Sequence, residues 1–328
     1  MSDMLPAVSI IIPTYNQRSD FLRQALLSAL AQGRSGVEII VSDNHSTNDT
    51  ATLLDEFSGN DIRVIRPPVH LELLENFAYA AENASGEYLC FLSSDDKLAD
   101  HAIQTLLNAA RMHPEAVAIY GDWLKINEQG EIIGQSPHTT YTDESAEILA
   151  HLQFLENITI GALIKASAYR LVGGFNYENS RIYYSGDVYL GLKLLAVGPA
   201  LHVAVNTMLV QAWSADGRQG RWAKLASDEV NILGYVASSQ QLLAKLPQNL
   251  SFYEVVRRYH FRRMIALSSK ALWEGLMTRQ QYAQLWTRFC EMLPRKSALF
   301  ARVVWNFPLG GISSGFAYLS YRLLKIVR

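Results

Sequence analysis

Short apolar segments alternate with amphipathic helical segments along the first 125 residues, and this alternation restricts the fold more than any other feature of the chain. The apolar segments are rich in Val, Ile, Leu and aromatic residues, as strands buried on both faces of a sheet are. They lie at residues 8–12, 38–42, 62–65, 88–92 and 117–120. Helical patterns lie between them at residues 21–32, 49–57, 73–84 and 99–112. This order predicts an α/β fold with a doubly wound, Rossmann-like and mostly parallel sheet.

The length of 328 residues is about twice that of an ordinary domain, so a second part is expected. We expect an α/β domain at residues 1–225, with a ligand-binding half at 1–125 and a second half at 126–225, followed by a helical C-terminal region at 226–328. The 49% apolar content excludes a disordered chain, and two cysteines cannot build a disulfide framework or a four-cysteine metal site. The first residues lack the pattern of a signal peptide, so we expect a cytoplasmic protein.

Polar residues follow three of the predicted strands. PTYN (13–16), DNHS (43–46) and SSDD (93–96) each stand where a strand ends. Ligands of doubly wound sheets bind in the crevice beyond the carboxyl ends of the strands. These three segments therefore mark the edge of the sheet at which a site is expected.

Asp43 and the turn after the first strand favour a nucleotide at this edge. A carboxylate at Asp43 can accept hydrogen bonds from the ribose or the base of a nucleotide. The ring of Tyr15 can stack on a base. Taken alone, Asp43 is equally typical of an Asx-turn or of a cap for the helix that starts near Asp49, and the residues alone leave both interpretations open.

Asp95 and Asp96 form a pair of carboxylates after a buried strand. An isolated Asp pair before a helix is most often a turn or an N-cap. At the carboxyl edge of a sheet, such a pair can instead hold a divalent cation that also binds substrate phosphates, which is the usual arrangement for Mg²⁺. A crevice of carboxylates would repel a diphosphate without that cation, so we predict a Mn²⁺ or Mg²⁺ site here.

Asp187 precedes the helical pattern VYLGLKLLAVG at residues 188–198. A single carboxylate at the start of a helix, placed in a pocket, can take a proton from an attacking hydroxyl group. Asp187 is therefore a candidate general base. A helix N-cap would account for the same residue equally well.

Four segments together resemble the family 2 glycosyltransferases, which have the GT-A fold. VSIIIPTYN (8–16), VSDNHS (41–46) and ENFAYAAENASGEYLCFLSSDD (75–96) are similar to the donor half of that family. GGFNYENSRIYYSGDVYLGLKL (173–194) is similar to its acceptor half. The resemblance extends over residues 8–225 and implies that a sugar is transferred, with inversion, from a nucleotide diphosphate sugar to a hydroxyl group.

The resemblance also implies a role for each candidate residue. It assigns the nucleotide pocket to Pro13, Tyr15, Asp43 and Asn76, the cation to Asp95 and Asp96, and the catalytic base to Asp187. Of the two metal-motif residues, Asp96 is the expected direct ligand of the cation.

Three positions depart from the family pattern. Ser93 stands where the metal motif often begins with Asp, Gly186 where a Glu often precedes the base, and Trp213 where a late His often helps to bind the metal. These departures imply a metal site weaker than is typical.

Arg218 and Arg221 lie in an expected loop, where either guanidinium could pair with the diphosphate. A solvated surface loop is the alternative.

The C-terminal part is strongly basic. Residues 251–328 hold 13 Lys or Arg and three Glu, a net charge of +10, whereas the rest of the chain has a net charge of −12. Basic, aromatic-rich helices are typical of anionic membrane surfaces, so we expect peripheral attachment to the cytoplasmic face of the inner membrane. Residues 303–321 are uncharged, but their Pro and Gly make a poor membrane span. A helical bundle or a homodimer contact is the alternative, and nucleic acid is not expected because no recognition motif accompanies the charge.

These features predict an inverting, cation-assisted glycosyltransferase. The expected acceptor is a saccharide or a lipid-linked intermediate of bacterial surface polysaccharide synthesis, such as lipopolysaccharide or O-antigen synthesis. Two alternatives stay open: a nucleotidyltransferase that makes a nucleotide sugar, and a non-catalytic scaffold that has kept the fold.

Overall fold

The computed structural model describes residues 7–33, 35–57, 59, 61–136, 159–175, 185–212, 222–239, 268, 271–272 and 275–291. The chain divides into two compact units. The first, which we call the sheet unit, comprises residues 1–148, 154–176 and 186–212, and the second, the helical unit, comprises residues 149–153, 177–185 and 213–328. The boundaries expected at residues 125 and 225 stay a prediction.

The sheet unit is built on a nine-stranded sheet with the order β3-β2-β1-β4-β8-β6-β9-β5, in which β7 pairs with β6. The strands are β1 (Val8–Thr14), β2 (Val37–Asp43), β3 (Ile62–Ile65), β4 (Tyr88–Phe91), β5 (Lys97–Leu98), β6 (Ala118–Ile126), β7 (Ile132–Gln135), β8 (Leu163–Lys165) and β9 (Ala200–Gln211). The helices are α1 (Ser19–Leu30), α2 (Thr50–Glu56), α3 (Leu73–Glu82), α4 (Ala102–Met112), α6 (Ala166–Leu171) and α7 (Gly186–Val197).

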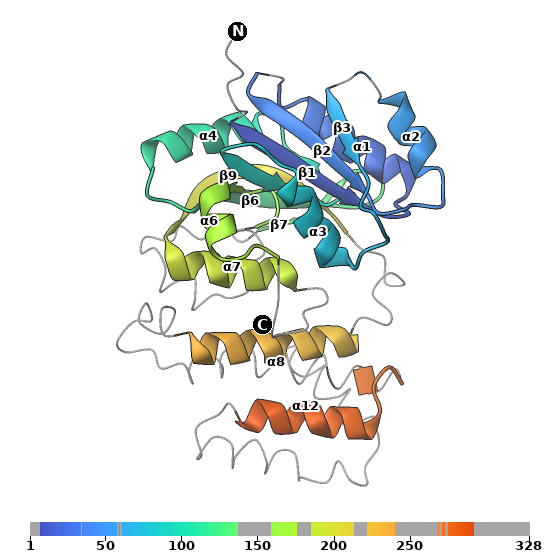
Figure 1. Cartoon of the computed structure of the whole chain (residues 1–328), viewed down its shortest axis with the longest axis vertical. Helices are drawn as coiled ribbons and strands as arrows, with labels where there is room; N and C mark the ends of the chain where they lie inside the picture. Colours follow the sequence, from blue (N-terminus) through green and yellow to red (C-terminus); the bar gives the residue numbers. More distant parts are fainter. Residues whose placement is uncertain are drawn as a thin grey trace. The chain divides into compact units, whose positions relative to one another are not determined.

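β1 is the central strand of the parallel part of the sheet. It pairs in parallel with β2 and β4, and β2 pairs in parallel with β3. Val8, Ile10 and Ile12 of β1 belong to one buried core with apolar side chains of α1, α2 and α4. α3 contacts β1 and β2 and is drawn below them in Figure 1. All seven residues of β1 are buried, and the predicted α/β fold with a mostly parallel sheet is confirmed.

The second half of the sheet is mixed, which the sequence did not predict. β8 is antiparallel to β4 and β6, and β7 is antiparallel to β6. β9 is 12 residues long and parallel to β6, with register shifts around Gly121 and Asp122. Such irregularities interrupt the alternation of apolar and polar residues from which a strand is predicted.

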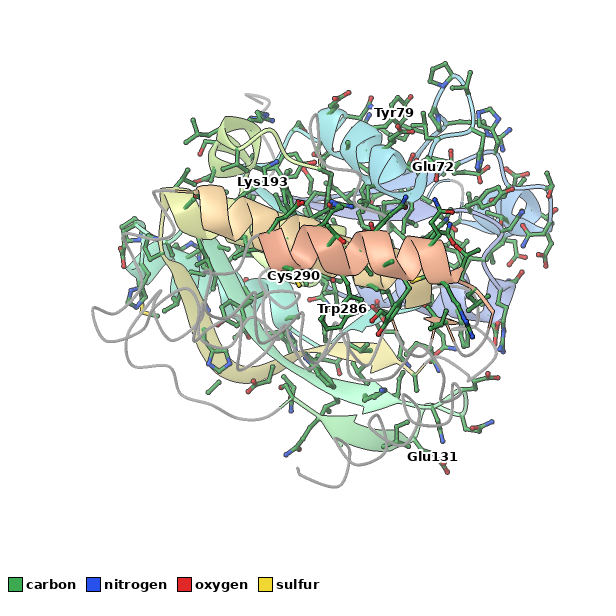
Figure 2. The ribbon with its side chains drawn as sticks, turned by 90° about the horizontal axis from the view of Figure 1, so that it is seen from below. Glu72, Tyr79, Glu131, Lys193, Trp286 and Cys290 are labelled. Carbon is green, nitrogen blue, oxygen red and sulfur yellow. The ribbon has the colours of Figure 1, made fainter. Side chains whose placement is uncertain are left out.

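The turn that follows α6 is fixed between two helices. Gly173 and Gly174 both have a positive φ, of 73° and 51°. The backbone N–H of Phe175 donates to the Tyr169 hydroxyl at 3.3 Å, and Nζ of Lys193 in α7 donates to the carbonyl of Gly174 at 2.7 Å. Lys193, labelled in Figure 2, is 8% exposed. The turn therefore couples α6 to the helix that begins beside Asp187.

The helical unit contains α8 (Trp222–Ser238) and α12 (Arg279–Glu291), which contact each other. Leu285 and Trp286 are buried, and Arg288 donates to Oδ1 of Asn231 at 2.5 Å. These two helices agree with the helical character predicted for the C-terminal region. Within the described part of the chain, no helix has both the length and the apolarity that a membrane span needs. Residues 303–321 lie outside the described residues.

Replacing Gly174 with Ala should destabilise the protein more than replacing Gly173 with Ala. A Cβ at Gly174 would overlap the ring of Tyr169, whereas a Cβ at Gly173 would approach only Nζ of Lys193, at 3.9 Å. The left-handed backbone costs either alanine about 1–2 kcal/mol, and the overlap adds about 1–3 kcal/mol for the first variant alone. Thermal melts of both variants measure the difference; equal melting temperatures would contradict this packing of the turn.

Replacing Lys193 with Met should change how stability depends on pH. Burial lowers the pKa of Lys193 from 10.5 to about 8, so between these values the unfolded chain binds more protons than the folded one. The wild-type free energy of unfolding should therefore rise, relative to that of the Lys193→Met variant, as pH increases through this window. The rise is at most about 1.4 kcal/mol per pH unit. Urea denaturation of both proteins across the window measures it, and a pH-independent difference would refute the lowered pKa.

Candidate functional site

The loops that follow β1, β2 and β4 meet at one edge of the sheet. The parallel register places Thr14 opposite Asp43, so β1 and β2 end together. Oδ1 of Asn16 accepts a hydrogen bond from the backbone of Thr47 at 2.7 Å, which ties the loop after β1 to the loop after β2. Nε2 of Gln17 donates to Oγ of Ser94 at 3.1 Å, which ties it to the loop after β4. The edge predicted from the sequence is therefore a single hydrogen-bonded surface.

The backbone turns sharply directly after both β1 and β2. Asn16 has a φ of 47° and His45 a φ of 62°, in the left-handed region that Asn and His enter more readily than most residues. Thr14 is 2% exposed, and its Oγ1 has no hydrogen-bond partner among the described residues. Buried polar atoms are nearly always paired, so an unpaired one at this edge is consistent with a place for a ligand.

Asp43 is the last residue of β2, and both oxygens of its carboxylate accept a hydrogen bond. It is 2% exposed; Oδ1 accepts the backbone N–H of Ser46 at 3.0 Å, and Oδ2 accepts Nη2 of Arg66. Burial opposes ionisation, but the hydrogen bonds from Ser46 and Arg66 outweigh it and hold the pKa of Asp43 below its ordinary value. The contact with Ser46 is the Asx-type turn that the sequence left open. The contact with Arg66 was not predicted.

Pro13 and Asn76 both lie next to Ser42, near the end of β2. Pro13 pairs opposite Ser42, beyond the last pair of β1 with β4, which is Ile11 with Phe91. Asn76 of α3 is 3% exposed and is bound twice to Ser42: Oγ of Ser42 donates to Oδ1 of Asn76 at 2.6 Å, and Nδ2 of Asn76 donates to the Ser42 carbonyl at 3.2 Å. Asn76 thus anchors α3 to the strand end that carries Asp43, and its predicted contact with a nucleotide stays a prediction.

The loop between β3 and α3 forms a second wall of the site. The ring of His70 packs on the ring of Tyr15, with centroids 4.5 Å apart, and its Nδ1 lies 3.0 Å from the Asn44 carbonyl. Tyr79, labelled on α3 in Figure 2, donates its hydroxyl to the carbonyl of Arg66 at 3.0 Å. This loop lies outside the three segments predicted to form the site, which follow β1, β2 and β4. The signal was present, because Arg66 directly follows the third parallel strand.

The two carboxylates after β4 differ in their surroundings. Asp96 is 7% exposed, and its Oδ1 accepts the backbone N–H of Gln211, the last residue of β9, at 2.8 Å. Asp95 is half-buried. No group of three or more His, Cys, Asp or Glu side chains gathers among the residues that the structure describes. Mg²⁺ and Mn²⁺ are commonly bound by one or two carboxylates together with substrate phosphates, so the oxygen ligands of Asp95 and Asp96 fit such an ion.

Asp187 lies in the first turn of α7, within the sheet unit. Its Oδ1 accepts the backbone N–H of Val188 at 2.8 Å, and its side chain is half-buried. The helix that carries it is largely buried, including Leu190, Leu192 and Leu194. A rigid, buried helix therefore presents the carboxylate at its positive N-terminal end. Trp213, Arg218 and Arg221 lie outside the described residues.

The groups at this edge suit a nucleotide that carries a diphosphate. An aromatic pair, Tyr15 and His70, stands beside a buried carboxylate and a guanidinium, all of which can contact a base or a ribose. The carboxylates of the β4 loop can hold a cation on a diphosphate. Asp187, the predicted proton acceptor, lies on another element of the same unit.

Two curated proteins are similar in sequence to part of this chain. Chondroitin synthase of Escherichia coli is 30% identical over 209 residues, which cover 61% of this chain and 28% of that protein. A Campylobacter jejuni GalNAc(5)-diNAcBac-PP-undecaprenol beta-1,3-glucosyltransferase is 32% identical over 114 residues, covering 32% of this chain and 35% of that protein. The matches thus span about a third or less of the length of these curated relatives.

The fold is similar to that of a solved structure. Residues 1–349 of Staphylococcus aureus TarS in complex with UDP-GlcNAc superpose with a TM-score of 0.67 at 13% identity, covering 90% of this chain and 87% of that one. Residues 9–169 match the family model described as glycosyl transferase family 2. The resemblance seen in the sequence motifs is confirmed over residues 9–169, which form a family 2 glycosyltransferase domain, and the fold is of the GT-A type.

Proposed function

We propose that the protein is an inverting glycosyltransferase that moves a sugar from a nucleotide diphosphate sugar to a hydroxyl group of a saccharide or lipid-linked acceptor. The observation that carries the proposal is the shared edge of the sheet, where Tyr15, Asp43 and the Asp95–Asp96 pair stand on neighbouring loops. The proposed catalytic carboxylate, Asp187, belongs to the same unit. The family 2 domain and the similarity to enzymes of polysaccharide synthesis support the same reaction class.

The donor binds, in this proposal, across the ends of β1, β2 and β4. Pro13, Tyr15, Asp43 and Asn76 line the pocket for the nucleoside. TarS was solved in complex with UDP and with UDP-GlcNAc, so a uridine diphosphate sugar is the first donor to test. Asp95 and Asp96 would hold Mn²⁺ or Mg²⁺, which when bound supplies positive charge that stabilises the leaving diphosphate.

Asp187 acts as the general base. Its carboxylate takes the proton from the acceptor hydroxyl, whose oxygen attacks the anomeric carbon from the face opposite the diphosphate. The new glycosidic bond forms while the bond between the anomeric carbon and the phosphate oxygen breaks, and the nucleoside diphosphate leaves with the electron pair. One displacement of this kind inverts the configuration of the anomeric carbon.

The acceptor belongs, in this proposal, to bacterial surface polysaccharide synthesis, such as lipopolysaccharide or O-antigen synthesis. The C. jejuni relative is named for an acceptor on undecaprenol diphosphate, which is a lipid carrier. The net charge of +10 in residues 251–328 suits an anionic membrane surface. We therefore propose that the enzyme works peripherally at the cytoplasmic face of the inner membrane, with a homodimer as the alternative role of the C-terminal region.

Replacing Asp187 with Asn should lower transfer by about 10²–10⁴-fold without loss of donor binding, because the amide cannot accept the proton. Asn keeps the oxygen that accepts the N–H of Val188, so the start of α7 should stay intact. Initial rates of product formation, with the nucleotide Kd and the melting temperature as controls, test this assignment. Turnover within a few-fold of wild type would rule out Asp187 as the base. Formation of a nucleotide sugar from a sugar phosphate would identify the nucleotidyltransferase alternative.

The donor site should show a cation-dependent gain in stability. A ligand at about 100 times its Kd adds about 2.7 kcal/mol, which raises the melting temperature by several degrees. We expect one nucleotide among UDP, GDP, dTDP and CMP to give a shift that Mn²⁺ enlarges, and Asp95→Asn and Asp96→Asn to abolish only the Mn²⁺-dependent part. Asn at position 96 keeps the acceptor for Gln211 N–H, so it separates metal binding from folding. An unchanged Mn²⁺ effect in both variants would refute the metal assignment, and no shift with any nucleotide would favour the scaffold alternative.

A further inference from the structure

A pocket of about 270 Å³ lies in the helical unit, between α8 and α12, which contact each other. α8 contributes polar side chains to its lining, and α12 with the turn before it contributes both polar and apolar ones. The lining includes Lys224, Ser227, Met277, Gln281, Leu285 and Arg288. Pockets that enclose a whole drug-sized ligand measure about 300–1,000 Å³. This pocket therefore suits a head group rather than a large molecule in full.

The pocket carries positive charge. Lys224 and Arg288 both line it, and none of its described lining residues is acidic. Nη2 of Arg288 donates to Oδ1 of Asn231 at 2.5 Å, a neutral partner that positions the guanidinium without neutralising it. Arg23 of the sheet unit, by contrast, faces the carboxylate of Glu56 at 2.7 Å. Because a guanidinium has five N–H donors, Arg288 keeps several for an anion in the pocket.

Two neutral side chains of the lining can donate hydrogen bonds to the same anion. Ser227 brings a hydroxyl group from α8. Gln281 lies in the first turn of α12, where its Oε1 accepts the backbone N–H of Thr278 at 2.8 Å and its own backbone N–H donates to Oγ1 of Thr278 at 3.2 Å. This reciprocal cap fixes the amide of Gln281. Because its oxygen is used there, the group that Gln281 can offer a ligand is the donor Nε2.

Another part of the lining is apolar. Met277 and Leu285 are 7% and 6% exposed. Met277 follows a tight turn at Gly275, whose φ is 70°. Trp286, the next residue of α12 after Leu285 and labelled in Figure 2, is also buried, so α12 is held in place by its apolar side chains. A lining of cations and donors next to buried apolar side chains matches a phosphate that is joined to hydrocarbon.

We propose that this pocket binds the phosphate group of an amphiphile, with Arg288 and Lys224 paired to the phosphate and Leu285 in contact with the adjoining hydrocarbon. Two kinds of molecule have this chemistry, a membrane phospholipid and an isoprenoid diphosphate. The inference goes beyond the proposed function, because it requires neither a donor at the sheet edge nor Asp187 as a base. It places a ligand in the helical unit, where the basic charge of the chain is concentrated.

The test compares Arg288→Met with Arg279→Met. Arg279 is the first residue of α12, is exposed and is not among the residues that line the pocket, so its replacement removes an equal charge from the same helix. Calorimetric titration uses monomeric dihexanoylphosphatidic acid, farnesyl diphosphate and inorganic phosphate, all in EDTA so that no cation holds a diphosphate at the sheet edge. Wild type should bind at least one amphiphile more tightly than inorganic phosphate. Arg288→Met should weaken that binding by about 10- to 100-fold, the loss expected for one charge-assisted hydrogen bond, and Arg279→Met should leave it nearly unchanged.

A second variant, Lys224→Met, tests the pocket from α8 in case Arg288→Met folds poorly because its bond to Asn231 is lost. Melting temperatures show which variants stay folded, and Lys224→Met should also weaken amphiphile binding. The amphiphile that binds more tightly in wild type identifies the source of the phosphate. Inorganic phosphate bound as tightly as both amphiphiles, equal losses in Arg288→Met and Arg279→Met, or no binding of either amphiphile would overturn the inference.

Discussion

β1 is covered on both faces and paired on both edges, and this burial determines where the rest of the sheet unit can place polar chemistry. A strand in such a position has an apolar interior, because an unpaired polar side chain there would cost several kcal/mol. Its polar residues are therefore confined to its ends. Parallel pairing then brings the ends of β2 and β4 to the same edge, so that the loops carrying Asp43 and Asp95 become neighbours although they are distant in the sequence.

The parallel half of the fold could be predicted because the residue pattern that marks each strand lies within a few consecutive residues. Strands β1, β2 and β4 are short apolar runs with a polar segment at or just beyond their ends, and the carboxyl-edge rule of doubly wound sheets then predicts the place of the site. β9 escaped prediction because its register with β6 shifts around Gly121 and Asp122, which obscures the alternation of apolar residues. The structural tie of Asp96 to Gln211 escaped for another reason, since it joins residues 115 positions apart.

From the sequence, each acidic residue could either form a turn or cap, or bind a ligand. One carboxylate can do both at once. Each ionised carboxylate has about four lone-pair positions. Asp43 uses one oxygen for the turn with Ser46, and Asp96 uses one for the N–H of Gln211. Such contacts fix the carboxylate in one orientation, which is what recognition of a base or a cation requires. A turn-forming Asp at the edge of a parallel sheet is thus better placed for binding than a mobile one.

The two sides of the proposed site differ in how their functional groups are held in place. On the side proposed for the nucleotide, the loops are held to one another by hydrogen bonds, as between Asn44 and Leu71, so polar contacts fix their positions. On the side of Asp187, the support is mostly apolar: α7 is largely buried, and Lys193 joins it to the turn at Gly174. A proton acceptor must approach an attacking hydroxyl to within hydrogen-bond distance, and a displacement of about 1 Å can lower the rate 100-fold. A helix that cannot shift without disturbing a packed core is therefore a suitable support for the proposed base, and the buried lysine, costly as it is for stability, fixes that helix to the turn.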